Sequence, residues 1–378
     1  MAGKLAITCV VGTRPEAIKM APVIRELQRC DWARVSVLST AQHRHMVDPL
    51  LRFFGIAVDD DLDVMTVDQS LPRLTGRLLE RIADALAARR PDLVIAQGDT
   101  TTVMATAIAC FYAGIPFAHV EAGLRTGDLR QPFPEEFNRA VAARVAALNF
   151  APTDLARRNL LREGIAAERI VITGNTVIDA LLWTAQQAPE IAVPLGAEQR
   201  LLFVTLHRRE SFGAPLRNAL MAIRRLVAAN PALIVLYPVH PNPNVSGPAH
   251  ELLGGIERVT LCAPLDYPDS VSAMRRAHLI LTDSGGIQEE APALGKPVLV
   301  AREITERPEA VEAGVARLVG TDAERICREV QRLLDDRAAY SAMAKGVSPY
   351  GDGHAARRIR DAIAAFHGGS PVAEGQSA

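Results

Sequence analysis

Residues 5–29 read LAITCVVGTRPEAIKMAPVIRELQR, and this stretch sets the pattern for the whole chain. Its first part, Leu5–Val11, is an apolar run rich in β-branched residues, which predicts a buried strand. Pro15–Arg29 then shows helical periodicity, with Pro15 in the first turn, where proline is well tolerated. A buried strand followed directly by a helix is half of a βαβ unit, the building block of parallel sheets.

The same alternation runs along the chain and is interrupted once, at Thr184–Gln199, which carries two prolines, a glycine and two adjacent glutamines. We therefore predict an α/β fold with two Rossmann-like domains that face a central cleft. The predicted parts are an N-terminal domain at 1–183, a C-terminal domain at 184–352, a helix at 353–367 that crosses back to the first domain, and a disordered tail at 368–378. The predicted strands are 5–11, 35–39, 93–96, 116–120, 170–172, 201–205, 234–238, 259–262, 279–282 and 298–301.

Composition narrows the class of protein. The chain carries 42 Lys and Arg against 43 Asp and Glu, a net charge of -1, which argues against a nucleic-acid binder with a basic surface. The five cysteines are odd in number, and no two have CxxC spacing, which argues against a disulfide framework or a zinc site. No signal segment or apolar stretch of membrane-spanning length is visible, so we expect a cytoplasmic protein that is not membrane-bound.

Parallel sheets bind ligands at the carboxyl ends of their strands, so the loops that follow the strands are the place to look for chemistry. The first loop, Gly12–Lys19, is not a GxGxxG fingerprint, which disfavours a nicotinamide dinucleotide. It instead offers two cations, Arg14 and Lys19, at the start of a helix. This arrangement suits a diphosphate, although ordinary surface charge is an equally good explanation of these residues alone.

Three acidic motifs follow in the first half of the chain. Asp99, in a GDTTT motif after a strand, either caps the next helix or serves in a site. Glu121 ends a strand before a glycine-rich turn, where a carboxylate is more often functional. Glu135 and Glu136 are both in the first turn of a predicted helix, where acids suit the helix dipole. Adjacent helix positions do not share a face, so at most one of these two can enter the cleft.

In the second half, the turn Ser284, Gly285, Gly286 between a strand and a helix lets backbone N–H groups approach phosphate oxygens. Glu290, further along that helix, can accept hydrogen bonds from two adjacent ribose hydroxyls. Arg307, after a later strand, adds another ligand for phosphate or hydroxyl groups.

Histidines complete the set of polar groups. His207 is followed by two arginines after a strand, which places it near an anionic ligand. His240 is in a proline-rigidified loop, where it either serves a site or satisfies a loop carbonyl. His43 and His45 are two residues apart on a predicted helix, so their rings point to different faces, and we predict no metal site.

Taken together, the motifs GTRPEAIKMAP, AQHR, GDTTT, HVEAGLRTGD, PFPEEFNR, HRRESFG, VHPNPNV, DSGGIQEE and TERPEAV resemble those of the non-hydrolysing bacterial UDP-N-acetylglucosamine 2-epimerases. The resemblance runs in the same order from Val11 to about Gly353. It implies a GT-B-like fold, a homodimer, no cofactor or metal, and a role in supplying precursors of bacterial surface polysaccharides. The implied ligands are UDP-N-acetylglucosamine and UDP.

The resemblance also assigns roles to matching positions. It implies that Asp99, Glu121, Glu135 and His207 carry the chemistry. The implied substrate-binding residues hold the diphosphate, the ribose and the uracil, the last in the loop Pro264–Ser270: Arg14, Lys19, Leu265, Ser270, Ser284, Gly285, Gly286, Glu290 and Arg307. A second UDP-N-acetylglucosamine, bound as an activator, would contact Gln42, Arg208 and His240.

The expected reaction is inversion at C2 of the hexose by elimination and readdition of UDP through a glycal, with two of the three carboxylates as base and acid. Alternatives remain at this point: a glycosyltransferase on the same fold, a hydrolysing epimerase, a silent sugar-nucleotide sensor, and an epimerase for a 3-acetamido uronate derivative. The surplus of carboxylates argues against the sensor, because acids repel a diphosphate.

Overall fold

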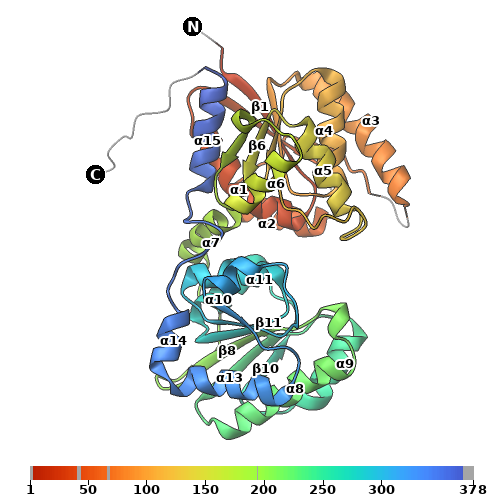
Figure 1. Cartoon of the computed structure of the whole chain (residues 1–378). Helices are drawn as coiled ribbons and strands as arrows, with labels where there is room; N and C mark the ends of the chain where they lie inside the picture. The colour runs from red at the N-terminus through yellow and green to blue at the C-terminus, as the bar shows by residue number, and fades with distance from the viewer. Residues whose placement is uncertain (1–2, 41–43, 66–68, 194, 369–378) are drawn as a thin grey trace. The chain divides into compact units, whose positions relative to one another are not determined.

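The computed structural model describes residues 3–40, 44–65, 69–193 and 195–368. The chain divides into two compact units (Figure 1). Unit 1 comprises Met1–Ala180 together with Gly353–Ala378, and unit 2 comprises Leu181–Asp352.

The described part of unit 1 contains a parallel sheet of seven strands in the order β3-β2-β1-β4-β5-β6-β7. The strand order reverses between β1 and β4, and this is the point at which open α/β sheets bind their ligands. The strands are β1 Leu5–Val11, β2 Ala33–Ser39, β3 Asp60–Asp61, β4 Leu93–Gln97, β5 Phe117–Val120, β6 Leu148–Ala151 and β7 Ile170–Ile172.

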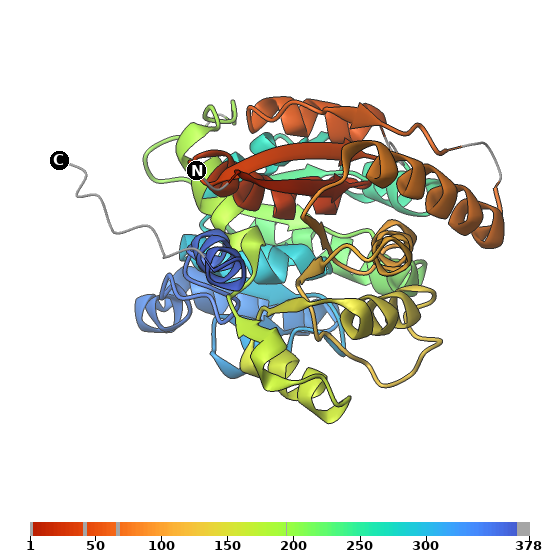
Figure 2. The same cartoon turned by 90° about the horizontal axis from the view of Figure 1, so that it is seen from above.

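Helices cover both faces of this sheet. Helices α3, α4 and α5 lie side by side on one face and enclose an apolar core (Figures 1 and 2). Helices α1 and α15 pack against each other on the other face, although α15 comes from the end of the chain. The helices of this unit are α1 Arg14–Gln28, α2 Arg44–Phe53, α3 Leu71–Arg89, α4 Thr101–Ala113, α5 Glu135–Val145, α6 Asp154–Arg162 and α15 Ala355–Phe366, and α7 Thr176–Gln187 passes from unit 1 into unit 2.

The described part of unit 2 repeats the plan with six parallel strands in the order β10-β9-β8-β11-β12-β13, which reverses between β8 and β11. The strands are β8 Arg200–Thr205, β9 Leu233–Pro238, β10 Val259–Cys262, β11 Leu279–Thr282, β12 Val298–Val300 and β13 Ala316–Leu318. The helices are α8 Ala214–Ala229, α9 Pro243–Leu253, α10 Tyr267–Arg276, α11 Gly285–Glu290, α12 Pro308–Glu312, α13 Ala323–Asp335 and α14 Arg337–Met343.

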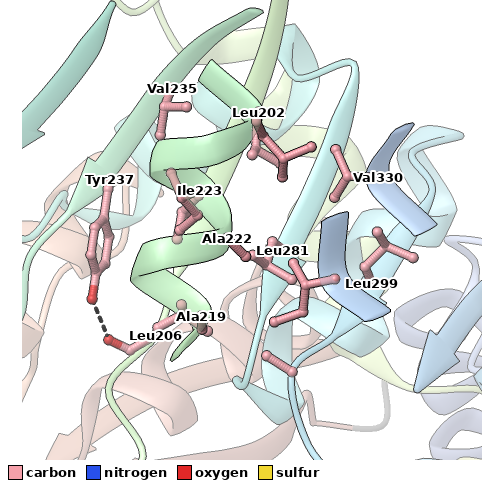
Figure 3. Packing of buried hydrophobic residues seen from close by; sticks show 14 of the residues in the cluster. Leu202, Leu206, Ala219, Ala222, Ile223, Val235, Tyr237, Leu281, Leu299 and Val330 are labelled. Atoms are coloured by element: carbon pink, nitrogen blue, oxygen red, sulfur yellow. Dashed lines mark hydrogen bonds between the residues drawn. The ribbon is translucent and has the colours of Figure 1, made fainter. Parts of the chain in front are cut away.

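The core of unit 2 forms where α8, α9 and α13 cover one face of the sheet. Figure 3 shows side chains of α8, such as Ile223, packed among residues of the central strands, such as Leu202 and Leu281. One polar contact crosses this apolar layer: the fully buried Tyr237 donates its hydroxyl to the carbonyl of Leu206, at 2.7 Å (Figure 3). Leu206 is directly before His207, so the core fixes the start of a candidate site loop.

The predicted fold class, two parallel Rossmann-like α/β sheets, is confirmed by these topologies. The interruption at Thr184–Gln199 overlaps the end of α7, which continues to Gln187. The short strands β3, β6 and β13 are absent from the prediction, since they have two, four and three residues and lack the long β-branched run of β1. No helix in the described ranges is both long and apolar enough to span a bilayer.

Candidate active site

The loop after β1 is held by a buried glutamate. Thr13 is the N-cap of α1, and Glu16 accepts its backbone N–H at 3.0 Å and that of Gly12 at 2.5 Å. The other oxygen of Glu16 accepts the hydroxyl of Thr100, at 2.6 Å, from the loop after β4. Glu16 therefore ties together two loops that follow neighbouring strands, and the exposed Arg14 is on one of them.

This glutamate titrates unusually. Burial raises the pKa of the Glu16 carboxyl to about 7, although the three hydrogen bonds to it lower the pKa. The negative charge of Asp99 also raises the pKa of Glu16, because two nearby carboxylates repel each other.

Glu121 is the centre of a second cluster. It follows β5 in a left-handed backbone conformation, with φ of +63°, which is rare for a residue with a side chain and costs about 1–2 kcal/mol. Such strain recurs at functional sites. Both Glu121 oxygens accept from Lys19 Nζ at 2.7 Å, and Gln97 and Asn175 also donate to this carboxylate. The structure thus pairs Lys19, predicted to hold a diphosphate, with a predicted catalytic acid.

Asp99 is the third acid of this sheet edge. Its carboxylate accepts from Arg139 Nη2 at 2.5 Å, and its backbone carbonyl accepts from Asn138 at 2.9 Å. Burial raises the pKa of Asp99, Arg139 opposes the rise, and the charges of Glu121 and Glu135 add to it. Thr100, and not Asp99, caps α4 with its side chain. The capping explanation for Asp99 is therefore wrong.

The two adjacent glutamates of α5 differ in burial and in hydrogen bonding. Glu136 is buried, and one oxygen accepts the backbone N–H groups of Thr126 and Gly127 at 3.0 and 3.1 Å. Glu135 is half-buried, and within the described ranges no hydrogen bond or ion pair to its side chain is found, although its charge reaches Asp99. Glu136 therefore has a structural role, and a role of Glu135 in the site stays a prediction.

In unit 2, His207 and Asp283 lie in the loops that follow the neighbouring strands β8 and β11. Asp283 is fully buried and accepts the backbone N–H groups of His207 and Arg208, both at 2.8 Å. Its other oxygen is 3.7 Å from His207 Nδ1. The His207 loop is therefore attached to the strand that leads into the Ser284 turn.

The Ser284–Gly286 turn opens α11, as predicted, and the six residues of this helix end at Glu290. The guanidinium of Arg208 lies over this turn, since a Cβ on Gly285 would be 3.6 Å from Arg208 Nη2. Glu290 is buried. The pKa of the neighbouring Tyr267 hydroxyl is raised by burial and, in addition, by the charge of Glu290.

The two arginines predicted to bind anions in unit 2 face carboxylates. Arg307 pairs through Nε with the buried Glu289. Arg208 Nη1 is 4.0 Å from Glu306, whose pKa is lowered to about 2 by a hydrogen bond from Arg302. A ligand phosphate would therefore compete with Glu289 or Glu306 for these cations.

The predicted uracil loop is shorter than expected. Helix α10 begins at Tyr267, so Ser270 lies inside a helix and donates its N–H to Asp266, while the half-buried Leu265 remains in the loop. Asp266 caps this helix by accepting from Asp269 N, which is why the helix begins there.

Of the predicted activator residues, Gln42 lies outside the described residues. His240 is exposed, stacks on His207 with ring centroids 5.8 Å apart, and accepts the backbone N–H of Asn242 at Nδ1. His240 thus satisfies a loop N–H rather than a loop carbonyl. No cluster of three or more potential metal ligands occurs in the part of the chain that the structure describes.

Several site residues were missed by sequence reasoning. The Thr13-x-x-Glu16 spacing is a capping-box signal and could have identified Glu16. The partners of Glu121 and Asp99 give no local signal, because they arrive from elements 24 to 54 residues away. These residues are Gln97, Arg139, Asn175 and also His119, whose Nε2 donates to Gly98 O at 2.7 Å and whose pKa burial lowers to about 4.

Comparison with known proteins identifies the family of this chain. The UDP-N-acetylglucosamine 2-epimerase family profile matches residues 25–364. The chain belongs to this family. The UDP-N-acetylglucosamine 2-epimerase of Salmonella typhimurium is 50% identical over 372 residues, covering 96% of this chain and 99% of that protein. The Escherichia coli K12 enzyme is 49% identical over 369 residues, with 95% and 98% covered.

Solved structures of the family agree. The UDP-GlcNAc 2-epimerase from Neisseria meningitidis, bound to UDP-GlcNAc, is 41% identical with a TM-score of 0.85, covering 95% of this chain and 99% of that chain. The glycosyltransferase of kitacinnamycin is 14% identical with a TM-score of 0.63, a likeness of fold alone. The predicted family and the GT-B-like fold are confirmed.

Proposed function

We propose that this chain interconverts UDP-N-acetylglucosamine and UDP-N-acetylmannosamine without hydrolysis, by elimination and readdition of UDP. The observation that carries the proposal is the pairing of Asp99 and Glu121 at neighbouring strand ends in opposite environments. Burial raises the pKa of Asp99, whereas the Glu121 carboxylate accepts four hydrogen bonds, two of them from the Lys19 ammonium group. Two carboxyl groups in such different surroundings are suited to separate acid–base and electrostatic tasks.

The reaction needs both tasks because C2 has no neighbouring carbonyl, so its hydrogen is only weakly acidic. If the C1–O bond breaks as the C2 proton leaves, C1 gains positive character and a glycal remains. UDP then adds back with protonation from the other face, and C2 is inverted.

In this proposal, Asp99 and Glu135 handle the proton on the two faces of C2. Glu121, whose oxygens accept hydrogen bonds from Lys19, Gln97 and Asn175, stabilises positive charge at C1. A positioned proton-handling group typically contributes about 10²–10⁴ in rate, so each of the pair is essential.

The charge that builds on departing UDP needs its own stabilisation. Arg14 and Lys19 from unit 1 and the Ser284–Gly286 turn from unit 2 would bind the diphosphate. Glu290 would bind the ribose, Arg307 a phosphate or hydroxyl, and the Leu265–Asp266 loop with Ser270 the uracil. His207 would hold a phosphate oxygen or shuttle a proton. Loss of one preorganised contact of this kind typically costs about 10²–10³ in kcat.

The remaining expectations from the resemblance stay part of the proposal. A second UDP-N-acetylglucosamine would act as an activator through Gln42, Arg208 and His240. The chain would work as a cytoplasmic homodimer that supplies precursors of surface polysaccharides.

The decisive experiment is proton NMR of UDP-N-acetylglucosamine with the protein in deuterated water. We expect the mannosamine isomer to appear with deuterium at C2 and no free UDP to accumulate. Accumulated UDP would instead identify a hydrolysing epimerase, and no reaction without an acceptor sugar would favour a glycosyltransferase.

Variants test the two carboxylates directly. We expect Asp99→Asn and Glu121→Gln each to lose deuterium incorporation at C2 by about 10²-fold or more. Glu163→Gln is the matched control, since Glu163 is an exposed carboxylate paired with Arg125 in the same unit. Wild-type exchange in either site variant would refute the role given to that residue.

A further inference from the structure

The strongest group without an assigned task is the carboxylate of Asp283, at the end of β11. Asp283 is 0% exposed. Burying a carboxylate is costly unless other groups pair with it, so its presence here calls for an explanation. One oxygen, Oδ2, accepts two backbone N–H groups, from His207 and Arg208. The other oxygen, Oδ1, is buried and has no hydrogen-bond partner in the part of the chain that the structure describes.

That second oxygen faces an imidazole. Oδ1 is 3.7 Å from Nδ1 of His207, slightly too long for a hydrogen bond, while the His207 side chain is 41% exposed. A small rotation of the ring would close this gap. The atom on the other side of the imidazole, Nε2, would then be the one that meets a ligand.

We infer that Asp283 is a positioning residue that fixes the proton of His207 on Nδ1 and keeps a negative charge beside the ring, so that Nε2 serves the diphosphate of the substrate. This inference rests on the proposed function for the identity of the ligand, and the Asp283–His207 pairing itself can be measured without substrate. The same use of a buried carboxylate to set a histidine tautomer is known from serine hydrolases.

The surroundings of the pair support this task. Burial raises the pKa of Asp283, while the Arg208 N–H and the charge of His207 lower it, so a proton on the imidazole stabilises the charged carboxylate. Arg302, in the loop after β12, also interacts with the charge of Asp283.

Two further groups lie around the pair. Tyr237, on β9, keeps its proton because burial and the charge of Asp283 both raise its pKa. His240 stacks on the His207 ring and accepts the backbone N–H of Asn242 at Nδ1.

The test uses Asp283→Asn. The asparagine oxygen can still accept the two backbone N–H groups, so the loop is retained. Its NH₂ group, however, would donate toward Nδ1 and favour the Nε2–H tautomer. Removing the charge should also make the imidazolium form of His207 less stable, because the carboxylate beside the ring favours the charged ring.

The variant is examined by NMR of the free protein and by the activity assay. Long-range ¹⁵N–¹H NMR of free protein, with the His207 signals assigned by their loss in His207→Gln, should show Nδ1–H in the wild type and the opposite tautomer in Asp283→Asn. In the NMR assay with UDP-N-acetylglucosamine, kcat should fall by about 10²-fold with a much smaller change in KM. In a His207→Gln background, Asp283→Asn should cost little more, because both changes remove the same function.

Asp179→Asn is the matched control. Asp179 is also buried and accepts two backbone N–H groups, from Ala355 and Ala356 in unit 1, so its variant loses a similar charge without touching His207. An unchanged His207 spectrum in Asp283→Asn would overturn the inference, even if kcat fell. An Nε2–H tautomer in the wild type would overturn it without any variant. If the protein proved not to be an epimerase, the spectra of the free protein would still decide this pairing.

Discussion

At the scale of single residues, the same carboxyl group serves three different ends in this chain. Glu136 holds a turn, Glu121 forms an ion pair with Lys19, and Glu16 joins two loops while its pKa rises to about 7. The side chain is the same in all three, so the neighbouring donors and the depth of burial set the role.

Glu16 gives a pH prediction. Because its pKa rises from 4.5 to about 7 on folding, the native state binds more protons than the unfolded state in that window. Stability therefore falls as pH rises from 4.5 to 7, by about 3 kcal/mol from this residue. Glu16→Gln should remove that slope, since glutamine can accept from Gly12 and donate to Thr100 without titrating.

Urea unfolding of the wild type and Glu16→Gln at several pH values between 4.5 and 8 measures this difference. Glu163→Gln provides a control in which an exposed carboxylate is removed. Parallel stability curves for the wild type and Glu16→Gln would contradict the prediction.

At the scale of elements, the turn after β5 must approach α6 closely. Gly123 has φ of +92°, and a Cβ there would be 2.3 Å from the carbonyl oxygen of Ala156. Asn159 of α6 also donates to Gly123 O at 3.0 Å. The turn that follows Glu121 is therefore packed directly against α6.

We expect Gly123→Ala to destabilise the protein by about 3 kcal/mol and to slow exchange at C2, because either the turn or α6 must move. Gly127→Ala is a close control: its φ is +85°, but nothing is within 4 Å of the added Cβ. That change should cost only about 1 kcal/mol, the strain of the left-handed backbone. Denaturant unfolding and the NMR exchange assay check both variants, and equal costs would show that the contact with Ala156 has no effect.

At the scale of the whole molecule, the described part of unit 1 leaves two adjacent aromatic residues in solvent. Phe111 and Tyr112, at the end of α4, are 68% and 79% exposed. They are next to an apolar groove at the ends of α3 and α4, lined by Ala83, Leu86, Ala87, Arg90, Pro91, Ala113 and Ile115. Large exposed aromatic residues of this kind are typical of an interface, and we expect this face to contact a second copy of the chain.

We therefore expect the wild type to have twice the chain mass in solution and Tyr112→Asp to shift it to the monomer. Light scattering after size exclusion measures the mass. Phe366→Asp, at another exposed aromatic residue on α15, should leave the dimer intact. A monomeric wild type, or a dimeric Tyr112→Asp, would exclude this face as the interface.

The sequence alone determined the repeated strand–helix order, the parallel sheets and the positions of the polar residues, because local periodicity and strand-end loops are properties of short segments. The motif series was enough to predict the family. Short strands such as β6 escaped prediction, since a few residues carry too little periodic signal.

Only the tertiary structure decided which groups meet. Lys19 reaches Glu121 across 102 positions in the chain, Arg139 reaches Asp99 across 40, and Asp283 reaches the loop of His207 across 76. No local pattern encodes these pairs, because strand order in each sheet brings them together. Their charges and proton affinities follow from burial and from these partners, and both exist only once the chain has folded.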